Sequence, residues 1–205
     1  MHEVVLASGN AGKLAELKSL LADVEVSVIP QSALSVPEAD ETGRSFVENA
    51  LIKARHAAEH TGLAAIGDDS GLAVDALDGA PGIYSARYAG PSASDAENTA
   101  KLLADLREVP APRRTARFHC LVAYVRNADD PTPIICQGTW EGQIALVPEG
   151  DNGFGYDPVF YVPSHRCTAA QLPADEKNRI SHRARALALL REQMRSMDRD
   201  RSGPL

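Results

Sequence analysis

Three acidic side chains stand where a divalent cation could be bound. Asp68 and Asp69 are adjacent between two apolar runs, and Glu41 lies in a loop that also carries Glu38 and Asp40. Mg²⁺ is usually bound in proteins by one or two carboxylates together with water and substrate phosphates. Successive side chains of a strand point to opposite faces, so only one of the two aspartates is expected to reach the site. The alternative is a turn held by its own side-chain hydrogen bonds.

A second group of residues, near the N-terminus, suits phosphate. It is the hexapeptide Ser8-Gly9-Asn10-Ala11-Gly12-Lys13. Backbone N–H groups at a helix start, the positive end of the helix dipole and a lysine can together hold phosphate oxygens. The hexapeptide is not a Walker A motif, which has four residues between its glycines and Ser or Thr after the lysine, where this chain has Leu14. A capped helix with a surface lysine is the alternative.

Two later segments carry groups suited to a nucleotide base. Gly153-Phe154-Gly155-Tyr156-Asp157-Pro158 places an aromatic ring between two glycines, so the ring could meet a purine while the backbone approaches closely. Lys177 precedes Ser181-His182-Arg183 at a predicted helix start, which gathers three basic side chains near exposed backbone donors. The alternatives are a packed loop and a capped helix with solvated basic residues.

One motif match points to different chemistry. His56-Ala57-Ala58-Glu59-His60 fits the H-x-x-E-H pattern of a class of zinc peptidases. On a helical wheel both histidines fall outside the apolar arc of their predicted helix, which indicates a solvated face. We therefore reject a zinc site at this position.

The elements that must position these residues follow from hydrophobic periodicity and turn signals. The last helix is capped by Ser181, and the aspartate pair is predicted at a strand end. The order of elements indicates an α/β fold with a mixed sheet, in two lobes around a cleft. The predicted elements are a strand at 3–7, a helix carrying Leu14, Leu17 and Leu21, a helix at 44–60, short strands at 64–67 and 72–77, a helix begun by the capping box Ser94–Glu97, and paired strands at 115–126 and 134–147.

Composition narrows the class of protein. The chain has 205 residues, of which 44% are hydrophobic, and we expect one domain of two lobes over residues 1–197 with a flexible tail at 198–205. A formal net charge of -7 argues against a nucleic-acid polymer as partner. Three widely spaced cysteines indicate no disulfide framework and favour a reducing cytoplasm. No apolar run is long enough to predict a membrane span.

Taken together, six segments resemble the dITP/XTP pyrophosphatase family, also called inosine triphosphate pyrophosphatases. The residues of these segments match the family, and so do their order and spacing. The resemblance runs from about Val4 to Leu190, and the block at 68–90 is its most specific segment. The segments are SGNAGK at 8–13, ETG at 41–43, FVENALIKA at 46–54, DDSGLAVDALDGAPGIYSARYAG at 68–90, FGYDPVF at 154–160 and EKNRISHRARAL at 176–187.

The resemblance implies an elongated α/β fold with a central mixed sheet flanked by helices, two lobes with the active-site cleft between them, and a homodimer. It implies Mg²⁺ held by Glu41 and Asp69, with Asp69 also the proton acceptor. Residues 8–13 would bind the triphosphate of a purine nucleotide and Lys53 would reach its phosphates. Further substrate contacts would come from Ser70, Phe154, Gly155, Tyr156, Asp157, Lys177, His182 and Arg183.

The resemblance predicts hydrolysis of deaminated purine nucleotides to the monophosphate and pyrophosphate, and two other functions are alternatives to it. A Maf-type nucleotide pyrophosphatase, which acts mainly on pyrimidine nucleotides, usually has paired arginines where this chain has Gly12-Lys13. A nucleotide-binding regulator without catalysis would not need Glu41, Asp68 and Asp69 together. Both readings are therefore disfavoured.

Overall fold

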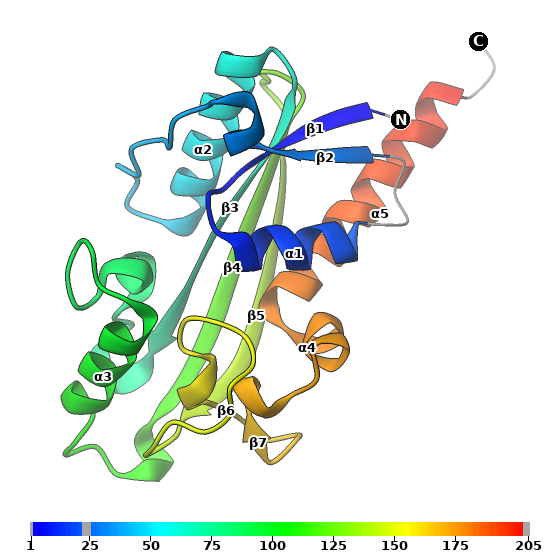
Figure 1. Cartoon of the computed structure of the whole chain (residues 1–205). Coiled ribbons are helices and arrows are strands. Elements are labelled where there is room, and N and C mark those ends of the chain that lie inside the picture. Colours follow the sequence, from blue (N-terminus) through cyan, green and yellow to red (C-terminus); the bar gives the residue numbers. More distant parts are fainter. Residues whose placement is uncertain (1, 22–25, 203–205) are drawn as a thin grey trace. The chain divides into compact units, whose positions relative to one another are not determined.

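The computed structural model describes residues 2–21 and 26–202, and within them the chain forms helices and a seven-stranded sheet with strand order β2-β1-β3-β4-β5-β6-β7 (Figure 1). β1 pairs in parallel with β2 and β3, whereas β6 pairs antiparallel with β5 and β7, so the sheet is mixed as expected. The strands are β1 (His2–Ala7), β2 (Val26–Pro30), β3 (Ala64–Val74), β4 (Thr115–Val125), β5 (Ile134–Ile144), β6 (Phe160–Val162) and β7 (Cys167–Thr168).

The helices begin at recognisable caps. Asn10 accepts a hydrogen bond from the Lys13 amide at the start of α1, and Ser45 does the same for Glu48 in α2. α3 begins with the predicted capping box of Ser94 and Glu97. The α-helices are α1 (Ala11–Leu20), α2 (Phe46–Thr61), α3 (Asp95–Asp105), α4 (Ala174–Ile180) and α5 (His182–Ser202).

The chain divides into two compact units. Unit 1 comprises the described parts of Met1–Asp69, Cys120–Gly138 and Arg183–Leu205, and unit 2 comprises Ser70–His119 and Thr139–His182. Two of the four boundaries between the units fall between predicted site residues, at the Asp69–Ser70 and His182–Arg183 peptide bonds. The predicted site residues are therefore shared between both units.

Unit 1 buries apolar side chains on both faces of its part of the sheet. Val4, Leu6 and Ile66 pack with residues of α1 and α5, whereas Val5, Ala7 and Ala65 pack with the alanines of α2. This is the alternation expected of strands whose side chains point to opposite faces. α1 and α5 therefore cover one face of β1 and β3, and α2 covers the other (Figure 1).

Gly67 allows α2 to lie very close to β3. A Cβ atom at this position would meet the Ala50 carbonyl oxygen and would lie 2.8 Å from the Ala54 amide nitrogen, both backbone atoms that cannot give way cheaply. The missing side chain thus brings the helix surface against the strand. Two residues further along the same face of β3 is Asp69.

Unit 2 has a core built around aromatic rings. Phe118, Trp140 and Phe160 pack together with ring centroids 4.6 to 6.4 Å apart, within the geometry that aromatic pairs prefer. Leu102 and Leu106 from the region of α3 join this cluster, as does Tyr156. This core supports the loop between β5 and β6, which carries residues 154–157.

The structure corrects one prediction about the strands. Asp68 and Asp69 were expected at a strand end, between short strands at 64–67 and 72–77, but they lie in the middle of the single strand β3. Residues 75–77 form a short 3₁₀ helix instead of strand. Asp-Asp-Ser-Gly is typical of a turn when its two carboxylates are exposed to solvent. Both aspartates are buried and paired, so the strand passes through them without a break.

The C-terminal region is helical further than expected. α5 continues through Ser202, although a flexible tail was predicted from residue 198. Residues 203–205 lie outside the described part of the chain, so the flexibility of this tail stays a prediction. Among the described residues, no helix combines the length and apolar character needed to cross a membrane.

Candidate active site

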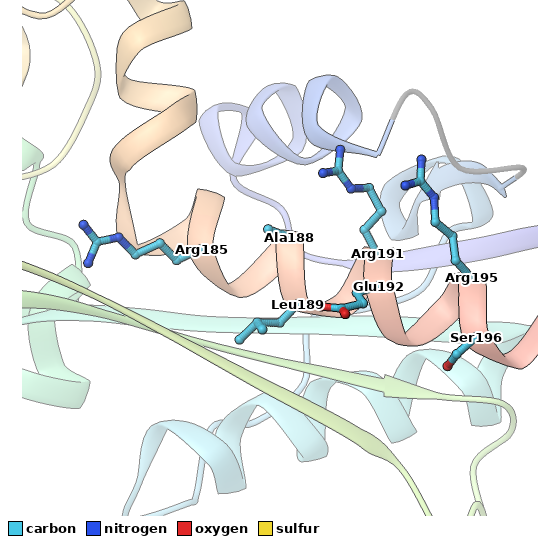
Figure 2. A pocket seen from close by; sticks show the side chains of 7 residues that line it. All are labelled: Arg185, Ala188, Leu189, Arg191, Glu192, Arg195 and Ser196. Carbon is cyan, nitrogen blue, oxygen red and sulfur yellow. The ribbon is translucent and has the colours of Figure 1, made fainter.

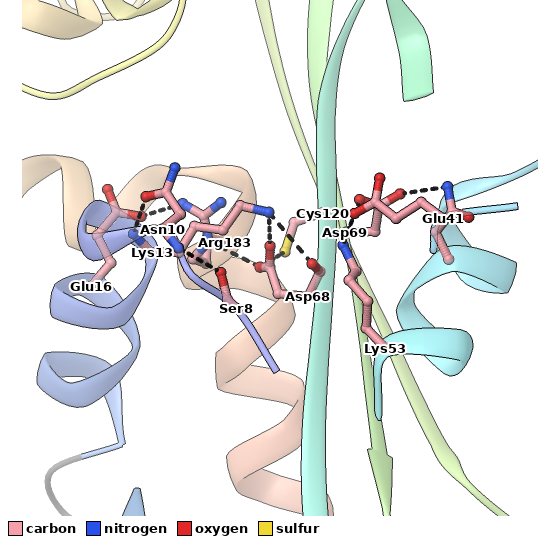
Figure 3. A network of polar contacts seen from close by, with 11 residues as sticks. Ser8, Asn10, Lys13, Glu16, Glu41, Lys53, Asp68, Asp69, Cys120 and Arg183 are labelled. Atoms are coloured by element: carbon pink, nitrogen blue, oxygen red, sulfur yellow. Dashed lines mark hydrogen bonds and ion pairs between the residues drawn. The ribbon is translucent and has the colours of Figure 1, made fainter. Parts of the chain in front are cut away.

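Asp68 and Asp69 project from opposite faces of β3 into two separate sets of charged residues. Figure 3 shows Asp68 directed toward α1 and α5, and Asp69 directed toward α2 and the loop that carries Glu41. The side chain of Asp68 is fully buried, and 8% of that of Asp69 is exposed. The alternation expected from the sequence is therefore found, and only Asp69 lies with Glu41.

On the α2 face, Lys53 joins the two carboxylates that were predicted to bind metal. Its Nζ atom lies 2.9 Å from Glu41 Oε1 and 2.9 Å from Asp69 Oδ1. Asn49, one helical turn earlier on α2, donates from Nδ2 to Asp69 Oδ2 at 3.3 Å and accepts the Gly43 amide at 2.9 Å. Glu41 and Asp69 therefore converge on one cationic centre, and Asn49 ties the acidic loop to the strand.

Burial and charge act in opposite directions on these groups. Burial raises the pKa of the Asp69 carboxyl, and the neighbouring Lys53 only partly offsets this effect. Burial would lower the pKa of Lys53, but the charges of Asp69 and Glu41 outweigh it and raise that pKa. Lys53 is thus held as a cation beside a carboxylate that is more basic than a free aspartate.

On the other face, Asp68 is the centre of a buried ion network. Its Oδ1 atom lies 2.5 Å from Lys13 Nζ, and its Oδ2 atom accepts from Arg183 Nε at 3.0 Å. The Cys120 thiol also donates to Oδ2 at 3.2 Å, and the guanidinium of Arg183 pairs further with Glu16. The network joins β3 to α1 and α5.

The charges of this network reinforce one another. Burial alone would raise the pKa of Asp68, but Arg183 and Lys13 overcome it and hold that pKa well below its usual range. Burial would lower the pKa of Arg183, and Asp68 is the main group that raises it instead. Asp68 is therefore a carboxylate committed to an ion pair and is not available to a metal.

The donor set on the α2 face fits one hard cation. No group of three or more His, Cys, Asp or Glu side chains that could hold a metal is found among the described residues. Mg²⁺ does not need such a group, because water and substrate phosphates commonly complete its octahedron. Glu41 Oε1 and Asp69 Oδ1 each lie 2.9 Å from a single positive centre, Lys53 Nζ, so the two carboxylates are close enough together to share one ion.

The predicted phosphate-binding turn lies between β1 and α1. Asn10 caps the helix through the Lys13 amide at 3.0 Å, and the Ser8 hydroxyl accepts the Asn10 amide at 3.2 Å. Gly9 lies beside the Glu38 carboxylate of the acidic loop, and Ala11 and Gly12 open the first turn of α1. Asn10 is thus the cap of a helix, as the alternative to a phosphate-binding turn supposed. Lys13, however, is directed at Asp68 of β3 and is not a solvated surface lysine.

In unit 2, Asp157 organises the loop that carries Phe154. Its Oδ2 atom accepts from the Phe154 amide at 2.9 Å and from Lys177 Nζ at 2.6 Å. Both charged side chains are buried, with 3% of Asp157 and 7% of Lys177 exposed. Lys177 Nζ also lies 4.8 Å from the centre of the Phe154 ring, a cation–π contact. Three predicted substrate contacts are thus placed together.

The remaining predicted contacts of unit 2 have structural partners as well. The Tyr156 hydroxyl donates to the Ser85 carbonyl at 2.8 Å, and burial raises its pKa. The His182 ring stacks on Phe118, with ring centroids 4.7 Å apart and planes 12° apart. Ser70 opens the part of β3 that belongs to unit 2. Although Arg183 follows His182 directly, it belongs to the Asp68 network of unit 1.

The histidines of the H-x-x-E-H match make contacts of another kind. His56 Nε2 lies 3.0 Å from the Pro37 carbonyl oxygen, and His60 Nδ1 lies 2.8 Å from the His56 carbonyl oxygen. Glu59 and His60 are exposed on α2. The His56 contact holds the acidic loop against the helix, whereas the His60 contact lies within α2.

A groove of about 740 Å³ lies along the outer face of α5 (Figure 2). Leu189, at its centre, is 47% exposed, while Ala186, Leu187 and Leu190 of the same helix are buried in the core of unit 1. None of its lining residues belongs to the predicted site. Its lining residues are Arg185, Ala188, Leu189, Arg191, Glu192, Arg195 and Ser196.

Sequence reasoning missed several residues that hold the site together. Asn49 contacts Asp69, and Glu16 and Cys120 surround the Asp68–Arg183 pair. Asn49 could have been found, because it lies four residues before Lys53 and so on the same face of a helix. Glu16 and Cys120 carry no local signal, since their contacts span 167 and 52 residues of sequence.

These features define an α/β protein with paired acidic and basic side chains on both faces of one strand and a capped, glycine-containing turn before the first helix. The particular family follows from comparison with known proteins. A model of the Ham1 family matches residues 4–193, and the chain belongs to that family.

Individual relatives cover nearly the whole chain. A dITP/XTP pyrophosphatase of Shewanella oneidensis is 62% identical over 190 residues, which are 93% of this chain and 92% of that protein. A dITP/XTP pyrophosphatase of Salmonella paratyphi A is 58% identical over 96% of this chain and 100% of its own. The solved structure of a HAM1 protein from Coxiella burnetii matches with a TM-score of 0.89 and 56% identity, covering 96% of this chain and 100% of that one.

Proposed function

We propose that this protein is a nucleoside triphosphate pyrophosphohydrolase that cleaves dITP, ITP and XTP to the monophosphate and pyrophosphate, and so removes deaminated purine nucleotides from the nucleotide pool. Membership of the Ham1 family and the names of the relatives support this activity. The observation that carries it is the convergence of Glu41 and Asp69 on one cationic centre, Lys53 Nζ, while Lys13 is held by Asp68 on the opposite face of the same strand.

The metal of this proposal is Mg²⁺, held by Glu41 and Asp69. When bound, it would offset the negative charge of the triphosphate and make the attacking water more acidic. The aspartate accepts the proton of that water as the α-phosphorus is attacked and pyrophosphate leaves. No serine or cysteine nucleophile is needed.

The triphosphate is assigned to residues 8–13 together with Lys53. Lys13 and Lys53 are both held as partners of aspartates on β3, so each ammonium group is positioned before substrate arrives. Such preorganised charge favours a reaction in which negative charge moves onto the leaving pyrophosphate. The buried Asp68–Arg183 pair fixes the strand that carries both aspartates.

The base is assigned to Phe154, Gly155, Tyr156 and Asp157, with Ser70, Lys177, His182 and Arg183 as further contacts. A hypoxanthine or xanthine ring would stack on Phe154, whose orientation is set by Asp157 and Lys177. These bases carry an acceptor oxygen at position 6, where adenine carries a donor amino group. A site of donors therefore discriminates against adenine, because a mismatched partner leaves buried polar groups unpaired.

Three further features belong to this proposal. The chain is a homodimer with its substrate site in a cleft, as the family resemblance implies, and size-exclusion chromatography with light scattering tests the dimer. It acts in the cytoplasm, for which the support is that its three cysteines are too widely spaced in sequence to indicate a disulfide framework. Its partner is a single nucleotide, and no nucleic acid or membrane is involved.

The test is the release of pyrophosphate from dITP, XTP, dATP, dGTP and TTP, assayed side by side with and without Mg²⁺. Strong preference for dITP and XTP, dependent on Mg²⁺, supports the proposal. Preference for TTP moves the protein to the Maf-type activity, and nucleotide binding without turnover makes it a regulator. Release of orthophosphate in place of pyrophosphate would contradict cleavage at the α-phosphorus.

A further inference from the structure

Helix α3 holds the backbone of Gly155, the residue that follows Phe154. The Asp95 carboxylate accepts the Gly155 amide through Oδ2 at 2.6 Å, and the Thr99 hydroxyl donates to the Gly155 carbonyl at 3.5 Å. Asp95 and Thr99 are four residues apart and so lie on the same face of α3. One face of α3 therefore forms hydrogen bonds with both the N–H and the C=O of Gly155.

The start of α3 does not need Asp95 as its cap. Ser94 accepts the Glu97 amide at 3.3 Å, and the Glu97 carboxylate accepts the Ser94 amide at 2.7 Å, which completes the capping box. Asp95 follows the cap and directs its carboxylate across to the loop. Its contact with Gly155 is additional to what the helix requires.

The loop borders open space on this side. A groove of about 510 Å³ lies between α3 and the loop, lined among others by Ala96, Leu103, Asp151 and Gly153. On its other side the loop is fixed by Asp157, which accepts the Phe154 amide and pairs with Lys177. Side-chain packing does not fill the groove, so on this side the loop is positioned by its two hydrogen bonds to α3.

Gly155 is also the residue of the loop whose backbone is least restricted. Its φ angle is +61°, and a Cβ atom there would meet nothing within 4 Å. Glycine occupies this conformation readily but also leaves it readily, because no side chain limits its backbone. Hydrogen bonds to both its N–H and its C=O therefore restrict the backbone conformation of Gly155.

We propose that Asp95 and Thr99 are positioning residues for recognition of the nucleotide base. By holding Gly155 they keep the neighbouring Phe154 ring presented to the purine, whereas the hydrolytic groups on β3 do not depend on them. This inference rests on the proposed function, which assigns the base to residues 154–157. It predicts that substitutions on this face of α3 change the affinity for the nucleoside part of the substrate and leave the chemical step alone.

The experiment measures steady-state hydrolysis of dITP by the wild type, Asp95→Ala, Asp95→Asn and Thr99→Val. Loss of a charge-assisted hydrogen bond should raise KM about tenfold in Asp95→Ala, with kcat within about twofold of the wild type. Asp95→Asn retains an acceptor oxygen and should recover most of the affinity. Thr99→Val removes the longer hydrogen bond and should raise KM less. Inhibition by inorganic tripolyphosphate, which lacks a base, should be the same in all four proteins.

Ser94→Ala is the matched control, because it removes the cap of the same helix without touching Gly155. It should lower the melting temperature of the protein and leave KM for dITP unchanged. An increase of KM in Ser94→Ala equal to that in Asp95→Ala would overturn the inference, since general weakening of α3 would then explain both. So would an unchanged KM in an active Asp95→Ala, or an equal loss of tripolyphosphate inhibition. Absence of dITP hydrolysis by the wild type would instead overturn the proposed function itself.

Discussion

The two units hold their site residues by different means. In unit 1, Lys13, Lys53 and Arg183 extend from three helices to two aspartates of one strand, and every charged side chain of the predicted site is part of an ion pair. In unit 2, the predicted site residues lie mostly on one loop, which is fixed by hydrogen bonds to its backbone and by the ion pair of Asp157 with Lys177.

This difference separates two kinds of constraint. The charges of unit 1 are fixed by regular elements and by one another, so removing one leaves a buried partner uncompensated. Apart from the buried Asp157–Lys177 pair, the loop of unit 2 is fixed by hydrogen bonds that can be weakened one at a time. We therefore expect substitutions in unit 1 to abolish chemistry or stability, and substitutions in unit 2 to alter substrate affinity by degrees. Four predictions test this contrast, in order of decreasing effect.

The largest effect is expected for Asp69→Asn. An asparagine keeps the shape of the residue but cannot accept the proton of the attacking water, so kcat for dITP should fall about 10³-fold. Calorimetry of dITP binding should show that the nucleotide still binds. The control is Asp40→Asn, an exposed acid next to Glu41, which should behave as the wild type. Turnover retained in Asp69→Asn would remove this residue from the role of proton acceptor.

The next effect is on stability, in Asp68→Ala. Only 2% of the Arg183 side chain is exposed, and loss of its buried partner should reduce the free energy of unfolding by about 3 kcal/mol. Urea unfolding followed by circular dichroism measures the difference. A loss below about 1 kcal/mol, as found for exposed pairs, would show that the Asp68 network does not stabilise unit 1.

A smaller effect is expected in unit 2, for Lys177→Met. The substitution removes the ammonium group from Asp157 and from the Phe154 ring but leaves the hydrogen bond of the Phe154 amide in place. KM for dITP should rise about tenfold, equivalent to about 1.4 kcal/mol, with little change in kcat. Arg179→Met, on the same short helix but exposed, serves as control. A fall in kcat that exceeds the rise in KM would contradict the separation of the two units.

The smallest effect is expected for Asp130→Asn, in the β4–β5 connection of unit 1 and away from the site. Hydrogen bonds from Arg126 lower the pKa of this buried carboxyl. A lowered pKa stabilises the fold above the unfolded value of about 3.9, and that contribution is lost as pH falls through the folded value. The variant should lose about 1 kcal/mol at pH 7, discounted because Arg126 is 40% exposed, and less at pH 3. Equal losses at both pH values would contradict this origin, and kcat and KM should not change.

The elements around the site were largely predictable because their signals are local. The capping box of α3 and the amphipathic α2 appear where cap residues and periodicity place them. The sheet was predicted as mixed, and β4 and β5 were predicted as neighbours. Alternation along a strand also predicted that only one of Asp68 and Asp69 would face Glu41.

The sequence did not predict the surroundings of the charged residues. Asp-Asp-Ser-Gly was read as an interruption, because nothing near it in sequence shows that Lys13, Lys53 and Arg183 would neutralise it. Asp95 was read only as part of a capping box, because its contact with Gly155 spans 60 residues. Long-range pairing of charges depends on the assembled fold, and local patterns carry no trace of it.

The position of the acidic pair inside β3 also bears on how this gene can change over evolutionary time. Asp68 and Asp69 reach different partners only because of their parity along the strand. An insertion or deletion of one residue between 64 and 67 would exchange their faces, turning Asp68 toward α2 and Asp69 toward α1 and α5. A point substitution in β3 changes the contacts of one side chain, whereas a single-codon length change would invert both networks at once. A change in the length of this strand therefore disturbs more of the site than any single substitution in it.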